Sequence, residues 1–259
     1  MDLGIGGRKA LICASSKGLG FACALALARE GADVVLNGRD EARLEAARSN
    51  LQAATGRSAE VLVADLVTSE GRSALETAAE GVDILVNNNA GPPPGPLASW
   101  DHAALLSALE HNLVSAALLI RAAIPAMRAR RFGRIVNITS AMVKSPHPLM
   151  GLSTSARAGL TALAKSVSLE AVVDNVTINN ILPERIDTDR QRFMAERIMR
   201  EQGVDLQEAR AQIVSTIAAK RFGTPAEFGD ACAFLCSAQA GYISGQNLQL
   251  DGGSYAGLF

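Results

Sequence analysis

The chain is poor in the residues that mark several whole classes of protein. Its 259 residues include four cysteines, one tryptophan and two tyrosines. Four cysteines in a chain of this length do not make a disulfide framework, and Cys232 and Cys236 have no second Cys or His pair at metal-ligand spacing. We therefore expect no metal site, and we interpret all four cysteines as small buried apolar residues.

Charge and hydropathy exclude further classes. The formal net charge of −1 at pH 7 gives no electrostatic reason to expect nucleic acid or an anionic membrane as a partner. The first residues, Met1 to Ile5, lack the basic and apolar stretches of a signal peptide. No apolar run approaches the roughly 18 residues of a membrane span, so we expect none. We therefore expect a cytoplasmic protein, with 48% hydrophobic residues and one domain over residues 1–259.

The most informative stretch that is present is a glycine turn near the N-terminus. An apolar run ends at Cys13, and the turn Ala14-Ser15-Ser16-Lys17-Gly18-Leu19-Gly20 leads into an Ala-rich helical segment. Strand, turn and helix start form a dinucleotide-binding unit, because the helix start offers free N–H groups and a positive dipole end to a pyrophosphate. Glycines let the backbone approach that ligand without a Cβ. We assign the turn residues 14–20 to such a site.

The end of the next strand-like run indicates which dinucleotide binds. NAD enzymes usually carry Asp or Glu there to hold the ribose 2′-OH, whereas Arg accommodates the 2′-phosphate of NADP. The acidic position falls here on Gly38, and Arg39 follows it. Lys17 adds a second cation on the same side. The sequence predicts NADP(H), unless both cations are ordinary solvated surface charges.

Strand-like and helical segments alternate along the chain, which is typical of a parallel sheet covered on both faces. We therefore expect an α/β fold with a single Rossmann-type, doubly wound parallel sheet of about seven strands. The expected strands are Ala10–Cys13, Val34–Asn37, Val61–Ala64, Ile84–Val86, Arg134–Ile138, Thr177–Leu182 and Asn247–Leu250. The expected helices include Ala22–Arg29, Ala42–Ala54, Ala103–Met127 and Ala156–Val173.

Two later segments have their own signals. Thr224-Pro225-Ala226-Glu227 combines a capping box with Pro at the first helical position, which predicts a helix start. Asp187–Lys220 is a charged helical excursion between the sixth and seventh strands. We expect it to form a lid over the substrate, the alternative being a merely solvated pair of helices.

The chain resembles the short-chain dehydrogenase/reductase family over essentially its whole length, and most closely its β-ketoacyl-carrier-protein-reductase-like branch. The motifs that carry the resemblance are Ser15-Ser16-Lys17-Gly18-Leu19-Gly20, Ala64-Asp65-Leu66, Asn87-Asn88-Asn89-Ala90-Gly91, His111-Asn112-Leu113, Gly133-Arg134-Ile135-Val136-Asn137-Ile138-Thr139-Ser140 and Asp251-Gly252-Gly253. The resemblance implies an NADP(H)-dependent enzyme that works as a homodimer or homotetramer.

The resemblance also implies further cofactor contacts. Asp65 and Leu66 flank the adenine, and Asn88 with Ala90 borders the ribose, although an additional Asn blurs that register. Ile186 and Thr188, after the sixth strand, are assigned to the same site.

The catalytic residues depart from the family pattern. The family uses an Asn, a Ser, and a Tyr with a Lys four residues on. Asn112 and Ser140 match the first two, but Ser153 takes the Tyr position and Arg157 the Lys position. An aliphatic hydroxyl is a far weaker acid than Tyr, and Arg stays protonated, so a matched proton donor is missing. Losing such a donor typically costs about 10²–10⁴ in rate. Arg157 could still hold the nicotinamide ribose and stabilise a developing alkoxide.

Lys144, four residues after Ser140, is a candidate replacement for the missing acid, with a solvent-facing loop lysine as the alternative. His147 in the same loop is a weaker candidate. We therefore expect an NADPH-dependent reductase of a carbonyl or acyl-thioester substrate that acts by hydride transfer. The alternative is a catalytically weak or inactive NADP(H)-binding protein, serving as a sensor or partner subunit.

Overall fold

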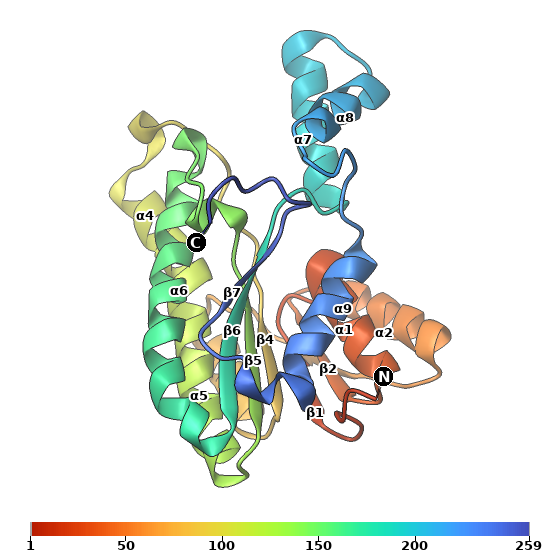
Figure 1. The fold of residues 1–259 in the computed structure, drawn as a ribbon, viewed down its shortest axis with the longest axis vertical. Helices are drawn as coiled ribbons and strands as arrows, with labels where there is room; N and C mark the ends of the chain where they lie inside the picture. The colour runs from red at the N-terminus through yellow and green to blue at the C-terminus, as the bar shows by residue number, and fades with distance from the viewer. Residues whose placement is uncertain (1, 259) are drawn as a thin grey trace.

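A computed structural model describes residues 2–258 and has a seven-stranded parallel sheet at its centre, in the order β3-β2-β1-β4-β5-β6-β7 (Figure 1). Each predicted strand is present, and its ends differ from the prediction by at most one residue. The strands are β1 (Lys9–Ile12), β2 (Asp33–Gly38), β3 (Glu60–Val63), β4 (Ile84–Asn87), β5 (Gly133–Ile138), β6 (Val176–Pro183) and β7 (Asn247–Leu250).

Helices cover both faces of this sheet, as Figure 1 shows. On one face lie α1 (Gly18–Arg29), α2 (Glu41–Thr55) and α9 (Pro225–Cys236), packed on the sheet through residues such as Leu27, Leu44 and Phe228. On the other face lie α3 (Ser69–Glu80), α5 (Ser115–Ala129) and α6 (Gly151–Ala171), packed through Leu75, Leu119 and Leu160. The doubly wound α/β architecture is therefore confirmed. Its buried faces explain the continuous apolar runs of the strands.

The strand order reverses at β1, which pairs with β2 on one side and with β4 on the other. All strands run parallel, so the segments that follow them meet at one edge of the sheet. The crevice beside such a reversal is where ligands bind in open α/β sheets. The turn after β1 and the asparagines after β4 meet there.

The long helix predicted over Ala103–Met127 is present, but it is not one regular helix. It consists of α4 (His102–Leu109), a π-helical turn η2 (Glu110–Val114) and α5. Single π turns inside α-helices often occur at functional sites. Asn112 lies in this turn and is buried.

By length and composition alone, the stretch His102–Ala129 is apolar enough to cross a membrane, whereas the sequence predicts no apolar run of that length. Polar residues such as Glu110 and Asn112 interrupt this stretch. In the structure α5 packs against α3, α6 and strands β4 and β5. These contacts are those of a helix that covers the sheet.

The excursion after β6 forms two helices, α7 (Asp189–Gln202) and α8 (Leu206–Ser215), which project beyond the sheet (Figure 1). They share a small core of Ala195, Ala209 and Ile213. The capping box that begins α9 is formed as predicted, with Thr224 and Glu227 each accepting from the other's backbone N–H. Helix α3 is not among the predicted helices, because its apolar residues are few.

Candidate active site

The turn between β1 and α1 leaves an open helix start at the carboxyl edge of the sheet. Lys17 is the N-cap residue of α1, yet its side chain caps none of the described N–H groups of the first turn. Gly18 has a φ of +61°, and a Cβ there would meet no described atom within 4 Å. At Gly20 a Cβ would lie 2.5 Å from the carbonyl oxygen of Ala14. Open N–H groups beside a closely packed glycine fit the pyrophosphate of a dinucleotide.

Ser15 and Ala14 shape this turn. The Ser15 hydroxyl donates to the carbonyl oxygen of Ile12 at 2.8 Å and accepts from the N–H of Asn37 at 3.0 Å. The Ser15 N–H donates to the carbonyl of Asn37. Neither donor of Ser15 is therefore left for the cofactor contact that the sequence predicts. Ala14 has a φ of 46°, in the left-handed region that L-residues rarely adopt.

The two cations predicted to hold a 2′-phosphate are in different surroundings. Arg39 follows β2, is 80% exposed, and its Nη1 lies 3.9 Å from Oδ2 of Asp65. The Lys17 ammonium instead donates to Oδ2 of Asp189 at 2.6 Å, and this contact lowers the pKa of that carboxyl. Lys17 thus links the glycine turn to the first residue of α7. A phosphate held by Lys17 has to displace the Asp189 carboxylate from the ammonium or share the ammonium with it.

The residues expected near the adenine and ribose surround the same crevice. Oδ1 of Asp65 accepts from the N–H of Val67, and the carbonyl of Leu66 accepts from Ser115. The Asn88 amide donates to the carbonyl of Ala14 at 3.2 Å, so it links the ends of β4 and β1. Ala90 is exposed beside it.

Ser16 and Leu19 are partly buried in the glycine turn and the first turn of α1. Beyond β6, Ile186 is buried and bridges to Gly223. Thr188 is the N-cap of α7, and its hydroxyl donates to the carbonyl of Ile186 at 3.4 Å. It also lines an open hollow of about 880 Å³ at the base of α7 and α8. The predicted cofactor residues therefore lie along the carboxyl edge, from β2 to the start of the excursion.

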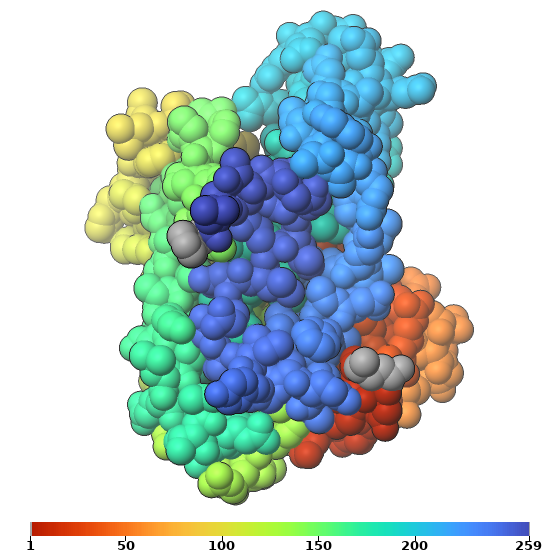
Figure 2. Space-filling model, viewed as in Figure 1, coloured from red at the N-terminus to blue at the C-terminus, as the bar shows by residue number. Residues whose placement is uncertain are grey.

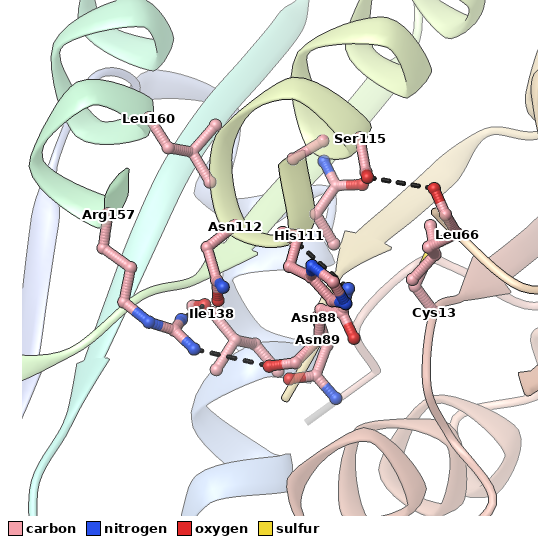
Figure 3. Close-up of a pocket in the computed structure, with 12 residues that line it drawn as sticks. Cys13, Leu66, Asn88, Asn89, His111, Asn112, Ser115, Ile138, Arg157 and Leu160 are labelled. Atoms are coloured by element: carbon pink, nitrogen blue, oxygen red, sulfur yellow. Dashed lines mark hydrogen bonds between the residues drawn. The ribbon is translucent and has the colours of Figure 1, made fainter. Parts of the chain in front are cut away.

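A small pocket lies between the end of β4, the π turn and α6, with about 300 Å³ of empty space that includes open solvent (Figure 3). Its polar lining consists of Asn87, Asn88, Asn89, His111, Asn112, Ser115 and Arg157. Within residues 2–258, the side-chain oxygens of Asn87 and Asn112 are buried and have no hydrogen-bond partner. Two unpaired acceptors at a pocket indicate that a hydrogen-bond donor, such as water or a ligand, occupies it.

Asn87 belongs to a row of asparagines that crosses four strands. Each side-chain amide donates to the next side-chain oxygen, from Asn87 to Asn137 to Asn180 to Asn247, at 2.8–2.9 Å. The strand register sets these residues directly opposite each other. The row satisfies buried amides and leaves the oxygen of Asn87 at its pocket end.

Arg157 is buried, and its guanidinium group already forms hydrogen bonds within the protein. It donates to the carbonyls of Ile138 at 2.7 Å, Thr139 at 2.9 Å and Asn89 at 3.3 Å, and to the hydroxyl of Ser153 at 3.2 Å. Burial lowers the pKa of Arg157 to about 10, so it stays protonated at neutral pH. In Figure 3 its guanidinium reaches from α6 to Asn89. The ribose contacts expected of Arg157 therefore compete with backbone carbonyls.

Ser140 and Lys144 bracket one turn of 3-10 helix, η3 (Ala141–Val143), as its N-cap and C-cap residues. The Ser140 hydroxyl accepts from the N–H of Met142 at 3.2 Å and is at the carboxyl end of β5. Lys144 is partly buried, and its ammonium lies 5.3 Å from the ring centroid of Tyr255. His147 is exposed and caps the next 3-10 turn, η4 (Pro148–Met150), as an ordinary loop residue does.

Two contributors were not identified from the sequence. Cys13 lines the pocket, and burial raises the pKa of its thiol to about 12, which makes it unreactive. Tyr255, in the C-terminal segment, lies beside Lys144, and no local pattern predicts that contact. In the part of the chain that the structure describes, no group of three or more His, Cys, Asp or Glu side chains could hold a metal ion.

Comparisons with known proteins agree with this geometry. The sequence model of a family described as enoyl-(acyl carrier protein) reductase matches residues 13–255. The 3-oxoacyl-[acyl-carrier-protein] reductase FabG of Rickettsia bellii is 32% identical over 250 residues, covering 96% of this chain and 97% of its own length. The NADPH-dependent reductase BacG of Bacillus subtilis is 29% identical over 252 residues, covering 95% and 97%.

Among solved structures, the L-sorbose reductase of Gluconobacter frateurii, complexed with NADPH and L-sorbose, superposes with a TM-score of 0.94. It is 30% identical, and both chains are covered completely. The chain belongs to the short-chain dehydrogenase/reductase family, in its FabG-like branch.

Proposed function

We propose that the protein is an NADPH-dependent oxidoreductase that reduces the carbonyl group of a small molecule. The observation that carries this proposal is the meeting of an uncapped helix start with Ser140 and Asn112 at one edge of the sheet. The L-sorbose reductase of the same fold, solved with NADPH, supports the choice of cofactor. Arg39, exposed after β2, supports a 2′-phosphate.

The cofactor, when bound, supplies the hydride. The chain's own residues place the acceptor: Ser140, at the end of β5, donates from its hydroxyl to the carbonyl oxygen that becomes an alkoxide. Arg157 supplies a buried positive charge beside the pocket and fixes the ends of β4 and β5 through three carbonyls. Asn112 offers an unpaired oxygen to the donor that fills the pocket.

Proton delivery cannot come from Ser153 or Arg157. The Ser153 hydroxyl is an acceptor for Arg157, and Arg157 keeps its proton at neutral pH. Lys144, at the other end of the turn that Ser140 begins, is the nearest candidate along the chain. The family relatives suggest a 3-oxoacyl thioester as one substrate class and a ketose as another.

One observation favours a second function, NADP(H) binding with little catalysis. The guanidinium N–H groups of Arg157 donate to protein carbonyls, which leaves fewer of them for a substrate or cofactor. A protein of this kind that binds NADP(H) and turns over slowly serves as a sensor or a partner subunit. Retention of Asn112 and Ser140 favours the enzyme.

We further propose one cytoplasmic domain that assembles into dimers or tetramers, with the excursion over 187–220 as its lid. Exposed apolar side chains support assembly: Leu105 and Leu106 on α4, Leu169 near the end of α6, Val173 in the 3-10 turn that follows α6, and Leu248 on β7. Sedimentation that shows only a 27 kDa monomer at micromolar concentration would contradict it. The ion pair of Lys17 with Asp189 supports a lid that contacts the cofactor site.

The proposed function is tested by NADPH oxidation, followed by absorbance, with L-sorbose, acetoacetyl-coenzyme A and an o-quinone. We expect turnover with at least one of these compounds and a loss of about 10²-fold or more in the Lys144→Ala variant. Binding of NADPH without oxidation by any compound would instead support the sensor or partner subunit.

A further inference from the structure

We propose that Asp189, the first residue of α7, competes with the phosphate groups of the bound dinucleotide for the ammonium group of Lys17. Cofactor binding then breaks the contact between the glycine turn and the excursion and releases the start of α7. The proposal rests on the NADP(H) site of the proposed function and adds to it a carboxylate that opposes cofactor binding.

The contact between the two side chains is short but exposed. Nζ of Lys17 donates to Oδ2 of Asp189 at 2.6 Å, between residues that lie 172 positions apart in the sequence. The contact lowers the pKa of Asp189, so this carboxyl is ionised at neutral pH. The two side chains are 62% and 74% exposed, and exposed ion pairs contribute little to stability. Another anion that reaches Lys17 can therefore replace Asp189.

Lys17 lies where the phosphate groups of a dinucleotide bind. It is the N-cap residue of α1, and its side chain caps none of the described N–H groups of the first turn. Those N–H groups and the helix dipole attract phosphate to the helix start. Because Lys17 is itself the N-cap residue, its flexible side chain can reach an anion bound there. A phosphate group carries at least the charge of a carboxylate and presents more acceptor oxygens to the three N–H donors of the ammonium.

The ion pair is the charged link between the excursion and the glycine turn. Helices α7 and α8 pack on each other through a small core of their own, and Figure 2 shows them as a lobe that projects beyond the rest of the protein. Within residues 2–258, the other ion pairs of α7 and α8 stay inside the excursion: Arg192 with Glu196, Arg197 with Glu201, and Arg210 with Asp187. Loss of the Lys17 contact therefore leaves the start of α7 without a charged link to the rest of the protein.

The connections at the base of the excursion do not depend on Lys17. The N–H of Asp187 donates to the carbonyl of Gly223 at 2.8 Å, and the N–H of Ala219 donates to the carbonyl of Gly252 at 2.9 Å. Release of Asp189 therefore leaves the excursion attached at its base and frees the start of α7 to move relative to α1.

A released Asp189 has a second cationic partner nearby. Arg192 lies three residues later on α7, where side chains at i and i+3 are neighbours, and its charge also contributes to the lowered pKa of Asp189. The Arg192 side chain is 70% exposed and lies 3.3 Å from Glu196, so it is free to turn toward Asp189. The exchange of partners therefore leaves neither the phosphate nor Asp189 without a cation.

The competing group is a phosphate, and NADPH offers two kinds. The pyrophosphate is common to NADH and NADPH, whereas the 2′-phosphate is present in NADPH alone. A comparison of the two cofactors therefore shows which phosphate takes Lys17.

The first test measures cofactor affinity by titration calorimetry at low ionic strength, where exposed charges are least screened. Asp189→Asn keeps the size of the side chain and removes its charge, so we expect NADPH to bind about fivefold tighter than it binds the wild type. An equal gain for NADH identifies the pyrophosphate as the competitor, and a gain for NADPH alone identifies the 2′-phosphate. Glu196→Gln removes one carboxylate from the same helix and pairs with Arg192 rather than Lys17 in the wild type, so it should change either affinity by less than about twofold.

Hydrogen exchange of the amides of residues 191–196 gives a second readout, which reports on the start of α7 itself. NADPH should speed this exchange in the wild type and in Glu196→Gln, because it releases Asp189. In Asp189→Asn the exchange should already be fast without the cofactor and should change little when NADPH is added.

A double-mutant cycle with Lys17→Met completes the test. Without the ammonium, Asp189→Asn should change NADPH affinity by less than about twofold. The inference is wrong if Asp189→Asn leaves NADPH affinity unchanged, weakens it as the loss of a clasp over the cofactor would, or raises it equally in the Lys17→Met background. In each of these cases NADPH still binds and the proposed function stands, whereas a wild type that binds neither cofactor contradicts both.

Discussion

Arg157 donates from Nε to the hydroxyl of Ser153 at 3.2 Å, across one turn of α6. These two residues stand where the resemblance to the family places a tyrosine and a lysine. Arg157 also donates to the carbonyls of Ile138 and Thr139 at the end of β5, so the pair forms a buried structural contact. The proposed reduction therefore needs a proton donor other than these two residues.

The first prediction concerns Ser153. Because its hydroxyl is a weak acid and serves as an acceptor for Arg157, Ser153→Ala should change kcat by less than about tenfold. Steady-state kinetics on the wild type and the variant check this. A thousandfold loss would show that Ser153 takes part in proton transfer after all.

Arg157 should matter for stability more than Ser153 does. Arg157→Ala leaves the carbonyls of Ile138 and Thr139 without their donor, so we expect the free energy of unfolding to fall by about 2–4 kcal/mol. NADPH binding should weaken as well, because the ends of β4 and β5 lose their link. Urea denaturation and calorimetry measure the two effects, and Ser153→Ala is the control. Unchanged stability would contradict the contacts described.

Arg39 should determine cofactor choice. A guanidinium that meets a 2′-phosphate should make NADPH bind at least tenfold tighter than NADH, or roughly 1.4 kcal/mol. Arg39→Asp should reverse the order, because a carboxylate repels the phosphate and accepts from a ribose 2′-OH. Equal affinities of the wild type for the two cofactors, by titration calorimetry, would refute this assignment.

Ala14 should be a strained position. Its φ of 46° costs an L-residue about 1–2 kcal/mol, whereas glycine adopts this conformation freely at an entropic cost of about 0.5–1 kcal/mol. Ala14→Gly should therefore raise the free energy of unfolding by about 0.5 kcal/mol. Ala53→Gly, on the exposed face of α2, is the matched control and should lower it by about 1 kcal/mol. A lower free energy of unfolding in both variants would show that Ala14 is unstrained.

Glu227 should make the free energy of unfolding depend on pH below about pH 4.5. Hydrogen bonds from Arg221 and from the Thr224 cap lower the pKa of Glu227 from 4.5 to about 2. The stabilisation is therefore complete above pH 4.5 and is lost as the pH falls toward 2. Glu227→Gln does not titrate, so the wild type's advantage in denaturation midpoint should shrink between pH 7 and pH 3. An advantage that stays constant would contradict the prediction.

Much of the fold can be predicted from the sequence, because apolar runs and helix-capping residues identify individual strands and helices locally. The apolar runs of β1 and β6 and the capping box of α9 identify their elements without tertiary information. The π turn at Asn112 does not follow, because its apolar pattern differs little from that of a continuous helix. For α3 the pattern is too weak, since Leu75 and Ala79 are among its few buried apolar residues.

For the site, the sequence predicts which residues come together but not which contacts they make. The motifs identify which residues gather at the carboxyl edge, and the structure brings Ser140, Asn112 and Arg157 there. The use of each donor depends on tertiary contacts that spacing does not encode. Lys17 forms an ion pair with Asp189, which is distant in sequence. The Ser15 hydroxyl accepts from the N–H of Asn37, and Lys144 lies against the ring of Tyr255 in the C-terminal segment.

The proposed reduction takes place on a carbonyl bound to Ser140, without acid catalysis by Ser153. A crystal structure of the protein with NADPH and a ketone substrate is the decisive test. We expect the pyrophosphate at the start of α1 and the carbonyl oxygen about 3 Å from the Ser140 hydroxyl, with Arg157 still bound to the carbonyls of Ile138 and Thr139. A carbonyl oxygen bound by the Ser153 hydroxyl instead, or a cofactor located away from α1, would contradict it.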